Sequence, residues 1–262
     1  KEINDANHKK KKKKRDVLPK DMRKFITDVQ KPQRKQGTYE KYIKRPADIV
    51  LSFCGLVILS PLYLVLALAV LIDDPGPVFF TQKRMGKDRS YFFMHKFRTM
   101  KMSTPHDMPT HMLVNPDQYI TRIGKFLRMS SLDELPQIWD IFRGKMSVIG
   151  PRPALWNQAD LIFEREKYRA NDVTPGLTGW AQINGRDELE IPAKARLDGE
   201  YVRRISFLFD CRCFMGTVFS VVRRDGVVEG GTAMLGQASL MNEDNGKVEA
   251  ADEQIQIKES KK

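Results

Sequence analysis

Asp133 and Glu134 are neighbouring carboxylates placed between Ser130-Ser131 and Pro136. Ser131 and Glu134 match the S-x-x-E capping box, and acidic residues are favoured near a helix N-terminus, so helix capping explains the pair without any chemistry. Pro136 favours a different helix start. Its missing N–H is tolerated at the first helical position but costs a hydrogen bond further into a helix.

A helix that begins at Pro136 places both carboxylates just ahead of it, exposed and close together. Such a pair can hold a divalent cation, and a carboxylate can also attack a phosphorus atom. On these residues alone, capping is the simpler explanation and the catalytic use stays open.

Basic residues suited to phosphate oxygens flank the acidic pair along the chain. Arginine forks match phosphate oxygens bidentately, and Gly-rich backbone lets N–H groups approach phosphates. Each arginine alone is explained by a surface ion pair, but together with an acid pair and an apolar anchor they indicate a diphosphate substrate at a bilayer surface. The residues are Lys96, Arg98, Arg128, Arg152 in a Gly-Pro-Arg-Pro run, and Arg186 at the end of the Gly-rich stretch 175–186.

The anchor is the stretch 49–72, which contains no charged residue and carries Ser60-Pro61 in its middle. As a helix it would be about 36 Å long, against about 30 Å for a hydrocarbon core. Proline interrupts a helix, and a nearby Ser can re-satisfy the freed carbonyl groups in lipid. Neither half of the stretch is long enough to span a bilayer alone.

Basic residues stand on both sides of this stretch, Lys41, Lys44 and Arg45 before it and Lys83 and Arg84 after it. Because basic flanks prefer the cytoplasm, a re-entrant hairpin explains both flanks without conflict. A single-pass helix with a mild proline kink is the alternative that the segment leaves open.

Most of the positive charge lies at the N-terminal end. The formal charge is +12, and residues 1–45 alone hold 17 basic and 6 acidic residues. The Lys-rich run at 9–15 predicts a disordered arm attracted to anionic lipid headgroups. Nucleic-acid binding is the competing interpretation, and the nearly neutral remainder of the chain offers no basic face to support it.

The remaining metal and redox candidates are weak. Cys54, Cys211 and Cys213 form no CxxC pattern, which fits a reducing compartment. His106 and His111 stand apart in a Pro-containing loop and are expected to be surface histidines rather than metal ligands. No signal-peptide cleavage site is apparent.

Hydrophobic periodicity and turn residues predict the other elements. Two aromatic-rich runs, 77–82 and 90–100, predict a β-hairpin around a Gly-containing loop. Amphipathic patterns predict helices, and the one at 198–223 fits either a membrane interface or a protein core. The expected helices cover 119–130, 130–142, 155–170 and 198–223.

Four blocks of sequence carry a specific resemblance. They are KFRTM at 96–100, LRMSSLDELPQIWDIFRGKMSVIGPRP at 127–153, PGLTGWAQINGR at 175–186, and a pattern formed by Asp198, Tyr201, Ser206, Phe207 and Asp210. Together they resemble the bacterial sugar transferase family, the small monotopic polyprenol-phosphate phosphoglycosyl transferases. The resemblance covers about residues 41–232.

The resemblance implies an α+β fold that is mostly helical, with a re-entrant membrane helix hairpin turning at Ser60-Pro61, interfacial amphipathic helices and a small β-hairpin. The expected organisation is a disordered arm at 1–40, the re-entrant helix at 41–72, a catalytic domain at 73–235 and a disordered polar tail at 236–262. The expected location is the cytoplasmic face of the bacterial plasma (inner) membrane.

The implied reaction moves a sugar-1-phosphate from a UDP-sugar to undecaprenyl phosphate, with UMP released, as the first membrane step of exopolysaccharide, capsule or glycoprotein assembly. The resemblance makes Asp133 the nucleophile that becomes phosphoglycosylated, with Glu134 assisting Mg²⁺ binding and proton handling. It implies that both acids are Mg²⁺ ligands. The expected substrate-binding residues are Lys96, Arg98, Arg128, Arg152, Arg186 and Asp198.

The expected partners are a UDP-sugar, undecaprenyl phosphate and anionic lipid headgroups, with downstream glycosyltransferases as further candidates and no nucleic acid. Two other hypotheses stay in view: a membrane-tethered scaffold acting through its Lys-rich arm, and a phosphatase-like hydrolase in which water replaces the lipid. The transferred sugar is left open among glucose, galactose, N-acetylated hexosamines and bacillosamine-type sugars.

Overall fold

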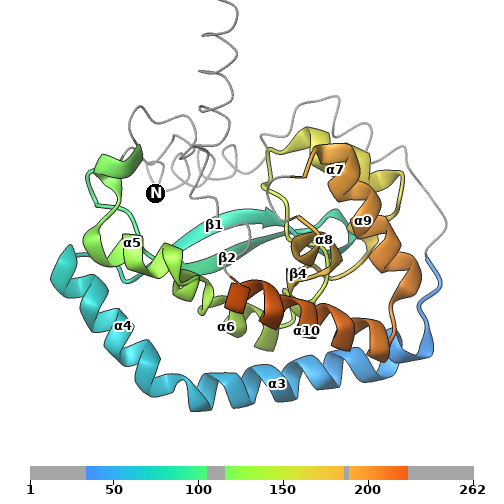
Figure 1. Ribbon diagram of the computed structural model, residues 1–262, viewed down its shortest axis with the longest axis horizontal. Helices are drawn as coiled ribbons and strands as arrows, with labels where there is room; N and C mark the ends of the chain where they lie inside the picture. Colours follow the sequence, from blue (N-terminus) through green and yellow to red (C-terminus); the bar gives the residue numbers. More distant parts are fainter. Residues whose placement is uncertain (1–33, 105–115, 186–188, 224–262) are drawn as a thin grey trace, which may run out of the picture. The chain divides into compact units, whose positions relative to one another are not determined.

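The computed structural model describes residues 34–104, 116–185 and 189–223, which are mostly helical with two small sheets. Their helices and strands are drawn in Figure 1. They divide into two compact units. The larger unit holds the described residues up to Ile58, together with Thr81–His95 and Gln137–Arg223, and the smaller holds those within Leu59–Phe80 and Lys96–Pro136. Outside the described residues lie the Lys-rich run, the polar tail, Arg186, His106 and His111.

The apolar stretch forms two helices. A π-helical turn at Tyr39–Ile43 continues into α3 (Lys44–Ile58), and α4 (Ser60–Asp73) follows after Leu59. Leu59 leaves the helical conformation, with φ −87° and ψ 0°, and Pro61 lies in the first turn of α4. The predicted break at Ser60-Pro61 is therefore confirmed, and the helical segment begins earlier than expected.

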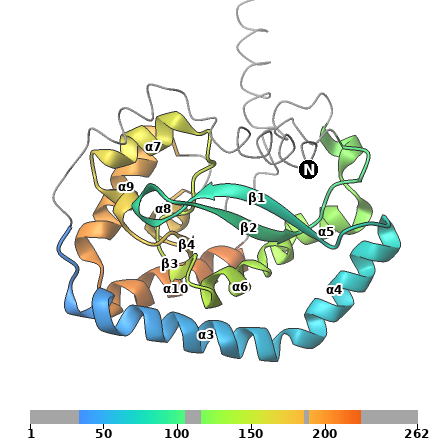
Figure 2. The ribbon, with the colours of Figure 1, turned by 180° about the vertical axis from the view of Figure 1, so that it is seen from behind.

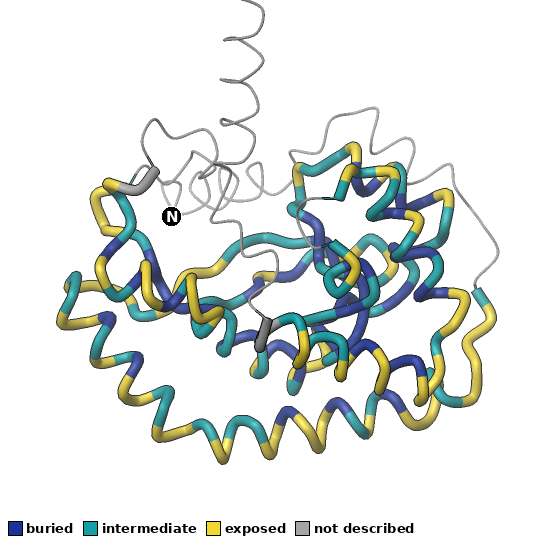
Figure 3. The backbone as a smooth tube through the Cα atoms, viewed as in Figure 1, coloured by how far each residue is buried: buried dark blue, intermediate teal, exposed yellow. Residues whose placement is uncertain are grey.

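Within the described residues, no single helix is long and apolar enough to cross a membrane. The helical segments Tyr39–Ile58 and Ser60–Asp73 meet that requirement only together, and they are bent by 61° at the break. Exposed residues recur along both helices (Figure 3), and most are large and apolar, as at Val50, Phe53 and Val65. By length and composition the pair fits a broken span or a re-entrant loop.

Charged residues at the start of α3 attach it to the larger unit. Arg45 donates to two carbonyl groups at the C-terminal end of α6 (Gln137–Phe142), at 2.6 and 2.7 Å. The Asp48 carboxylate accepts the N–H of Val148 in β3 (Ser147–Ile149) at 2.9 Å. The first turns of α3 are thus held by polar contacts, while its later turns expose apolar side chains.

A parallel two-stranded sheet forms where the sequence predicted a loop. β3 pairs with β4 (Gly176–Thr178), with Ser147 opposite Gly176 and Ile149 opposite Thr178. Glycines permit the close approach, because a Cβ on Gly176 would lie 2.1 Å from the backbone nitrogen of Gly150. The prediction of a loop throughout 175–186 is wrong: β4 is followed by the short helix α8 (Trp180–Ile183).

The C-terminal helices of the larger unit are α7 (Ala159–Glu166), α9 (Ile191–Arg204) and α10 (Phe207–Arg223). The prediction of a single helix over 198–223 is wrong, because the chain breaks at Ile205 and Ser206. The Ser206 hydroxyl accepts the N–H of Phe209 at 3.3 Å, and such a side-chain bond starts a new helix. A short 3₁₀ turn, Ala170–Asp172, lies between α7 and β4.

Helix α10 has two apolar faces with different surroundings. Phe209 and Cys213 are buried in a core that also contains Ile149, Val173 and Tyr201. Other side chains of the helix remain largely exposed, namely Phe207, Leu208, Phe214, Met215, Val218 and Phe219. One face of the helix therefore belongs to the core, and contact of its exposed apolar face with a membrane interface stays a prediction.

The β-hairpin is present, with strands β1 (Phe79–Met85) and β2 (Tyr91–Phe97). The five-residue connection contains a 3₁₀ turn at Lys87–Arg89, in which Asp88 adopts φ 51°. So short a connection makes the strands antiparallel, since parallel strands need a longer crossover. The strands are visible side by side in Figures 1 and 2.

The smaller unit is built around α4 and α5 (Arg122–Met129). The Thr121 side chain caps α5 by accepting the N–H of Gly124 at 2.9 Å. Two 3₁₀ turns complete the unit, Pro116–Tyr119 before α5 and Leu132–Glu134 after it. The second turn carries the two candidate carboxylates.

The close contact between Gly176 and Gly150 gives a stability prediction. Gly176→Ala should lower the free energy of unfolding by about 2 kcal/mol or more, because the new methyl group meets backbone atoms that cannot move aside. Thermal unfolding should show a fall in Tm of roughly 5 °C. Gly37→Ala is the control, since a Cβ there has no heavy atom within 4 Å. Equal Tm values for the two variants would contradict the tight packing.

Candidate active site

The two carboxylates lie on a short, strained turn. Asp133 and Glu134 occupy the 3₁₀ turn Leu132–Glu134, which follows Ser131 in the left-handed conformation at φ 56°. Helix α6 begins at Gln137, directly after Pro136. The helix start expected from Pro136 is therefore observed, with both acids ahead of the helix. The expectation that both acids are exposed is wrong, because Asp133 is buried.

The capping box is not formed. Ser131 makes no side-chain capping bond. The Glu134 carboxylate instead accepts a hydrogen bond from Lys96 at 2.9 Å. Capping by the Ser131 side chain, the main structural explanation for this pair, therefore does not account for the two carboxylates.

Lys96 joins both carboxylates from the end of strand β2. Its Nζ lies 2.9 Å from Glu134 Oε1 and 3.5 Å from Asp133 Oδ2. All three side chains are partly buried, with 12 to 19% of their surface exposed. One ammonium group between two neighbouring carboxylates offsets their mutual repulsion.

Burial and charge act in opposite directions on Asp133. Burial raises the pKa of the Asp133 carboxyl group, and this is the largest effect; the Glu134 charge raises it further. The positive charges of Lys96 and Arg128 lower the same pKa. The result is a more basic carboxylate than a solvent-exposed aspartate, kept close to two cations.

The two arginines nearest in sequence have different surroundings. Arg128, in the last turn of α5, donates from Nε to the Thr99 hydroxyl at 2.9 Å. Arg98 is buried and bonded internally, since its Nε donates to the Pro77 carbonyl at 2.7 Å and its two terminal nitrogens reach the carboxylate and carbonyl of Asp74. These contacts give Arg98 a structural task, and its contact with substrate stays a prediction.

The apolar helix α4 supports the carboxylate turn directly. Leu66 and Val70 of α4 are buried with Phe97 of β2 and Leu127 of α5. Partly buried side chains packed against this cluster include Leu132 and Leu135, on either side of the two acids, and Tyr63 of α4. The side chains on either side of the two acids therefore pack against the second helix of the apolar pair.

Two acids at the end of α4 strengthen this attachment, and the sequence analysis did not single them out. The Asp73 carboxylate accepts the N–H of Ile123 in the first turn of α5 at 2.8 Å. Asp74 pairs with Arg98 and also accepts the N–H of Met102 at 3.0 Å. Adjacent acids just after an apolar helix and before Pro-Gly were the signal that could have found them.

The other predicted site residues belong to the larger unit. Arg152 is partly buried in the Gly-Pro-Arg-Pro segment that follows β3, in which Gly150 and Pro151 form a bend. Asp198 of α9 is almost fully buried and forms an ion pair with Arg165 of α7 at 2.6 Å. This internal pair favours a structural role for Asp198, and substrate contact by either residue stays a prediction, as it does for Arg186.

Two glycine N–H groups of the Gly-rich motifs, those of Gly150 and Gly176, are bonded within the protein itself. Gly150 N–H donates to the Thr178 carbonyl at 2.8 Å, and Gly176 N–H donates to the Pro151 carbonyl at 2.9 Å. These bonds link the two motifs. The close approach of the backbones explains glycine at both positions without a phosphate, because a Cβ on Gly150 would lie 2.6 Å from the Thr174 carbonyl oxygen and one on Gly176 would lie 2.1 Å from the Gly150 nitrogen.

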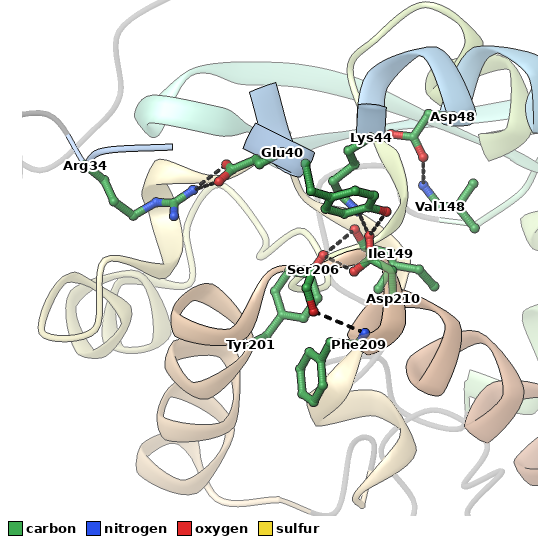
Figure 4. A network of polar contacts seen from close by, with 11 residues as sticks. Arg34, Glu40, Lys44, Asp48, Val148, Ile149, Tyr201, Ser206, Phe209 and Asp210 are labelled. Atoms are coloured by element: carbon green, nitrogen blue, oxygen red, sulfur yellow. Dashed lines mark hydrogen bonds and ion pairs between the residues drawn. The ribbon is translucent and has the colours of Figure 1, made fainter. Parts of the chain in front are cut away.

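A buried polar network joins the first turns of the helical segment that begins at Tyr39 to α10 (Figure 4). The Asp210 carboxylate accepts from the Tyr39 and Tyr201 hydroxyls at 2.8 Å and pairs with Lys44. Tyr201 OH also contacts the Ile149 carbonyl at 3.2 Å. Burial and the Asp210 charge raise the pKa of Tyr201, so its hydroxyl stays protonated as a donor.

The described residues contain no group of three or more His, Cys, Asp or Glu side chains that could hold a metal ion alone. Asp133 and Glu134 still fit Mg²⁺, which is usually bound through one or two carboxylates together with substrate phosphates. The chemistry of this pair thus suits a cation that arrives with a diphosphate.

Most of the chain matches one family of proteins. Residues 39–224 match the family model described as bacterial sugar transferase. This chain belongs to the bacterial sugar transferase family. The match covers the apolar helix pair, the carboxylate turn and the Gly-rich motifs, and it agrees with the resemblance seen in the sequence.

Two relatives of different length match this chain over the same number of residues. The chain is 40% identical over 192 residues to the UDP-glucose:undecaprenyl-phosphate glucose-1-phosphate transferase of Escherichia coli (strain K12), covering 68% of this chain and 40% of the relative. It is 38% identical over 192 residues to the exopolysaccharide production protein PSS of Rhizobium leguminosarum bv. phaseoli, covering 70% of this chain and 96% of the relative.

A third relative has a different sugar in its name. The undecaprenyl-phosphate galactose phosphotransferase of Salmonella typhimurium is 32% identical over 200 residues, 71% of this chain and 42% of the relative. The chain thus spans about 40% of the length of its long relatives and nearly all of the short one.

The opposing effects on Asp133 give a prediction for Lys96. In Lys96→Met the ammonium group that lowers the Asp133 pKa is lost, whereas burial remains, so this pKa should rise. The carboxylate should then become protonated at a higher pH than in the unaltered protein. Titration of ¹³C-labelled aspartate carboxyl groups by NMR measures this, with Lys101→Met as control. An unchanged or lower Asp133 pKa would argue against the contact.

Proposed function

We propose that this chain transfers a sugar-1-phosphate from a UDP-sugar to undecaprenyl phosphate, and so starts exopolysaccharide or a related glycan. The observation that carries the proposal is the turn in which Asp133 and Glu134 meet Lys96, mounted on α4. Family membership and the names of the relatives support the substrate class. Those names differ in the sugar, so the transferred sugar is to be identified by assaying a panel of UDP-sugars.

Asp133 is the proposed nucleophile. One oxygen of its carboxylate attacks the phosphorus that carries the sugar and forms a new P–O bond. The bond from this phosphorus to the bridging oxygen breaks, and UMP leaves with the electron pair. An oxygen of undecaprenyl phosphate then attacks the same phosphorus, and the Asp133 carboxylate leaves.

The surrounding residues serve this displacement. Burial makes the Asp133 carboxylate more basic, and Lys96 offsets the repulsion between the two acids. Arg128 adds a positive charge nearby for phosphate oxygens. Asp133 and Glu134 would hold Mg²⁺, which supplies charge neutralisation for the phosphates when bound.

The apolar helix pair is proposed to enter and leave the membrane on the cytoplasmic side. The bend at the Ser60-Pro61 break supports this, and so do the basic residues on both flanks. A re-entrant anchor keeps the carboxylate turn on the side where UDP-sugars are made. It also keeps the turn near the depth of a lipid phosphate.

The reaction is tested with the purified chain, Mg²⁺, undecaprenyl phosphate and a panel of UDP-sugars labelled in the sugar. The expected products are UMP and a labelled lipid that partitions into organic solvent. Free sugar phosphate as the main product would instead favour the hydrolase hypothesis. No turnover with any UDP-sugar would contradict the proposal.

The nucleophile assignment gives a mutational prediction. Asp133→Asn should lower kcat at least about 10³-fold, because an amide cannot form the covalent intermediate. Intact-mass measurement without the lipid acceptor should detect one added sugar phosphate on the unaltered chain and none on the variant. Asp88→Asn, in the hairpin turn where asparagine tolerates the positive φ, is the matched control. Full activity in Asp133→Asn would exclude this residue as the nucleophile.

The anchor topology gives a second prediction. Single cysteines placed at Lys41 and at Lys87, in a chain with its native cysteines replaced by serine, should both react with a thiol reagent from the cytoplasmic side only. Both flanks are basic and should stay in one compartment. Replacing Ser60-Pro61 by Ala-Ala should straighten the helix pair and move one flank to the opposite side. If the cysteines at positions 41 and 87 were labelled from opposite sides in a chain that keeps Ser60-Pro61, re-entry would be ruled out.

A further inference from the structure

Tyr63 connects the apolar helix to the turn that carries the two acids. It lies one turn into α4, just after the Ser60-Pro61 break. Its hydroxyl donates a hydrogen bond to the carbonyl group of Leu135, and its ring lies 5.7 Å from the ring of Phe97. Leu135 is the residue that ends the Leu132–Glu134 turn.

The backbone hydrogen bonds that close the turn are long. The N–H of Glu134 reaches the Ser131 carbonyl at 3.3 Å, and the N–H of Leu135 reaches the Leu132 carbonyl at 3.3 Å. Both distances exceed the usual range for such bonds. Pro136, the next residue, has no N–H to add. An external hydrogen bond therefore has a large effect on where this turn lies.

The side-chain packing around the turn does not replace that bond. Leu132 and Leu135 are only partly buried against the cluster formed by α4, α5 and β2. Apolar contacts of this kind are not directional, whereas a hydroxyl donating to a carbonyl fixes both position and orientation. Lys96 holds the two carboxylates, but it does so from a long and flexible side chain.

We propose that Tyr63 is a positioning residue for the transfer reaction. Its hydroxyl fixes the Leu135 carbonyl, and through it the backbone that aims Asp133. This inference rests on the proposed function for its effect on rate. The physical effect, the ordering of the turn by a side chain of the apolar helix, does not depend on that function.

The test compares three variants of the full chain. Tyr63→Phe removes only the hydroxyl and keeps the ring against Phe97. Tyr63→Met also removes the ring but keeps an apolar side chain. Tyr42→Phe is the control, because it removes a tyrosine hydroxyl from a residue that is 60% exposed. The amount of UMP released in the first turnover gives the fraction of active enzyme in each preparation.

Misplacing the nucleophile should slow the chemical step rather than binding. In Tyr63→Phe, the single-turnover rate of UMP release per active site should fall about tenfold, with KM for the UDP-sugar unchanged. Tyr63→Met should show the same loss, and Tyr42→Phe none. A residue important only for stability would lower Tm and the active fraction but leave the rate per active site unchanged.

Amide hydrogen exchange provides a readout that needs no enzymatic activity. The N–H groups of Glu134 and Leu135 should exchange about tenfold faster in Tyr63→Phe than in Tyr42→Phe. Unchanged exchange in Tyr63→Phe would overturn the inference, even in a preparation without transferase activity. Faster exchange with an unchanged rate per active site would also overturn it, because the turn would then move without affecting the chemistry. Loss of rate in Tyr63→Met alone would assign the role to ring packing and not to the hydroxyl.

Discussion

The attachment of α4 to the carboxylate turn is the constraint on which the site depends. Leu66 and Val70 of the apolar helix are buried with Phe97 and Leu127, and the leucines on either side of the acids pack on the same cluster. Two polar contacts at the C-terminal end of α4 hold it in place. Asp73 accepts an N–H of α5, the helix that carries Arg128, and Asp74 pairs with Arg98 itself. In the proposed function α4 lies in the bilayer, so the packing that stabilises this unit also sets the height of the nucleophile above the lipid.

Local rules of sequence predicted the features that depend on one or two residues. Proline's missing N–H placed both the break at Ser60-Pro61 and the helix start after Pro136, and the structure has them there. The pairing of β3 with β4 could not be found this way, because each strand has three residues and no readable periodicity. Their pairing depends on contacts between distant segments. The glycines are the sequence feature that relates to it, because they allow the two backbones to approach closely.

Residue type alone does not separate charges that hold the fold from charges that face a substrate, and the predicted substrate contacts of Arg98 and Asp198 stay predictions. Arg98 and Asp198 were chosen for their chemistry and their motifs, yet Arg98 pairs with Asp74 and Asp198 pairs with Arg165. A guanidinium group matches a carboxylate as well as a phosphate, so the sequence cannot tell which acceptor it has. Lys96 is different, because its ammonium group meets both members of the acidic pair.

The surroundings of Asp133 resolve a conflict that any buried carboxylate nucleophile faces. Removing water makes the carboxylate a stronger base, but the same burial favours the protonated form, which cannot attack. A second acid beside it makes the problem worse. The Lys96 ammonium group counteracts both effects on the ionised form while leaving the carboxylate poorly solvated. A cation held this close to the nucleophile must be free to shift when phosphate oxygens arrive, and a lysine on a flexible side chain meets that need better than a rigid arginine fork.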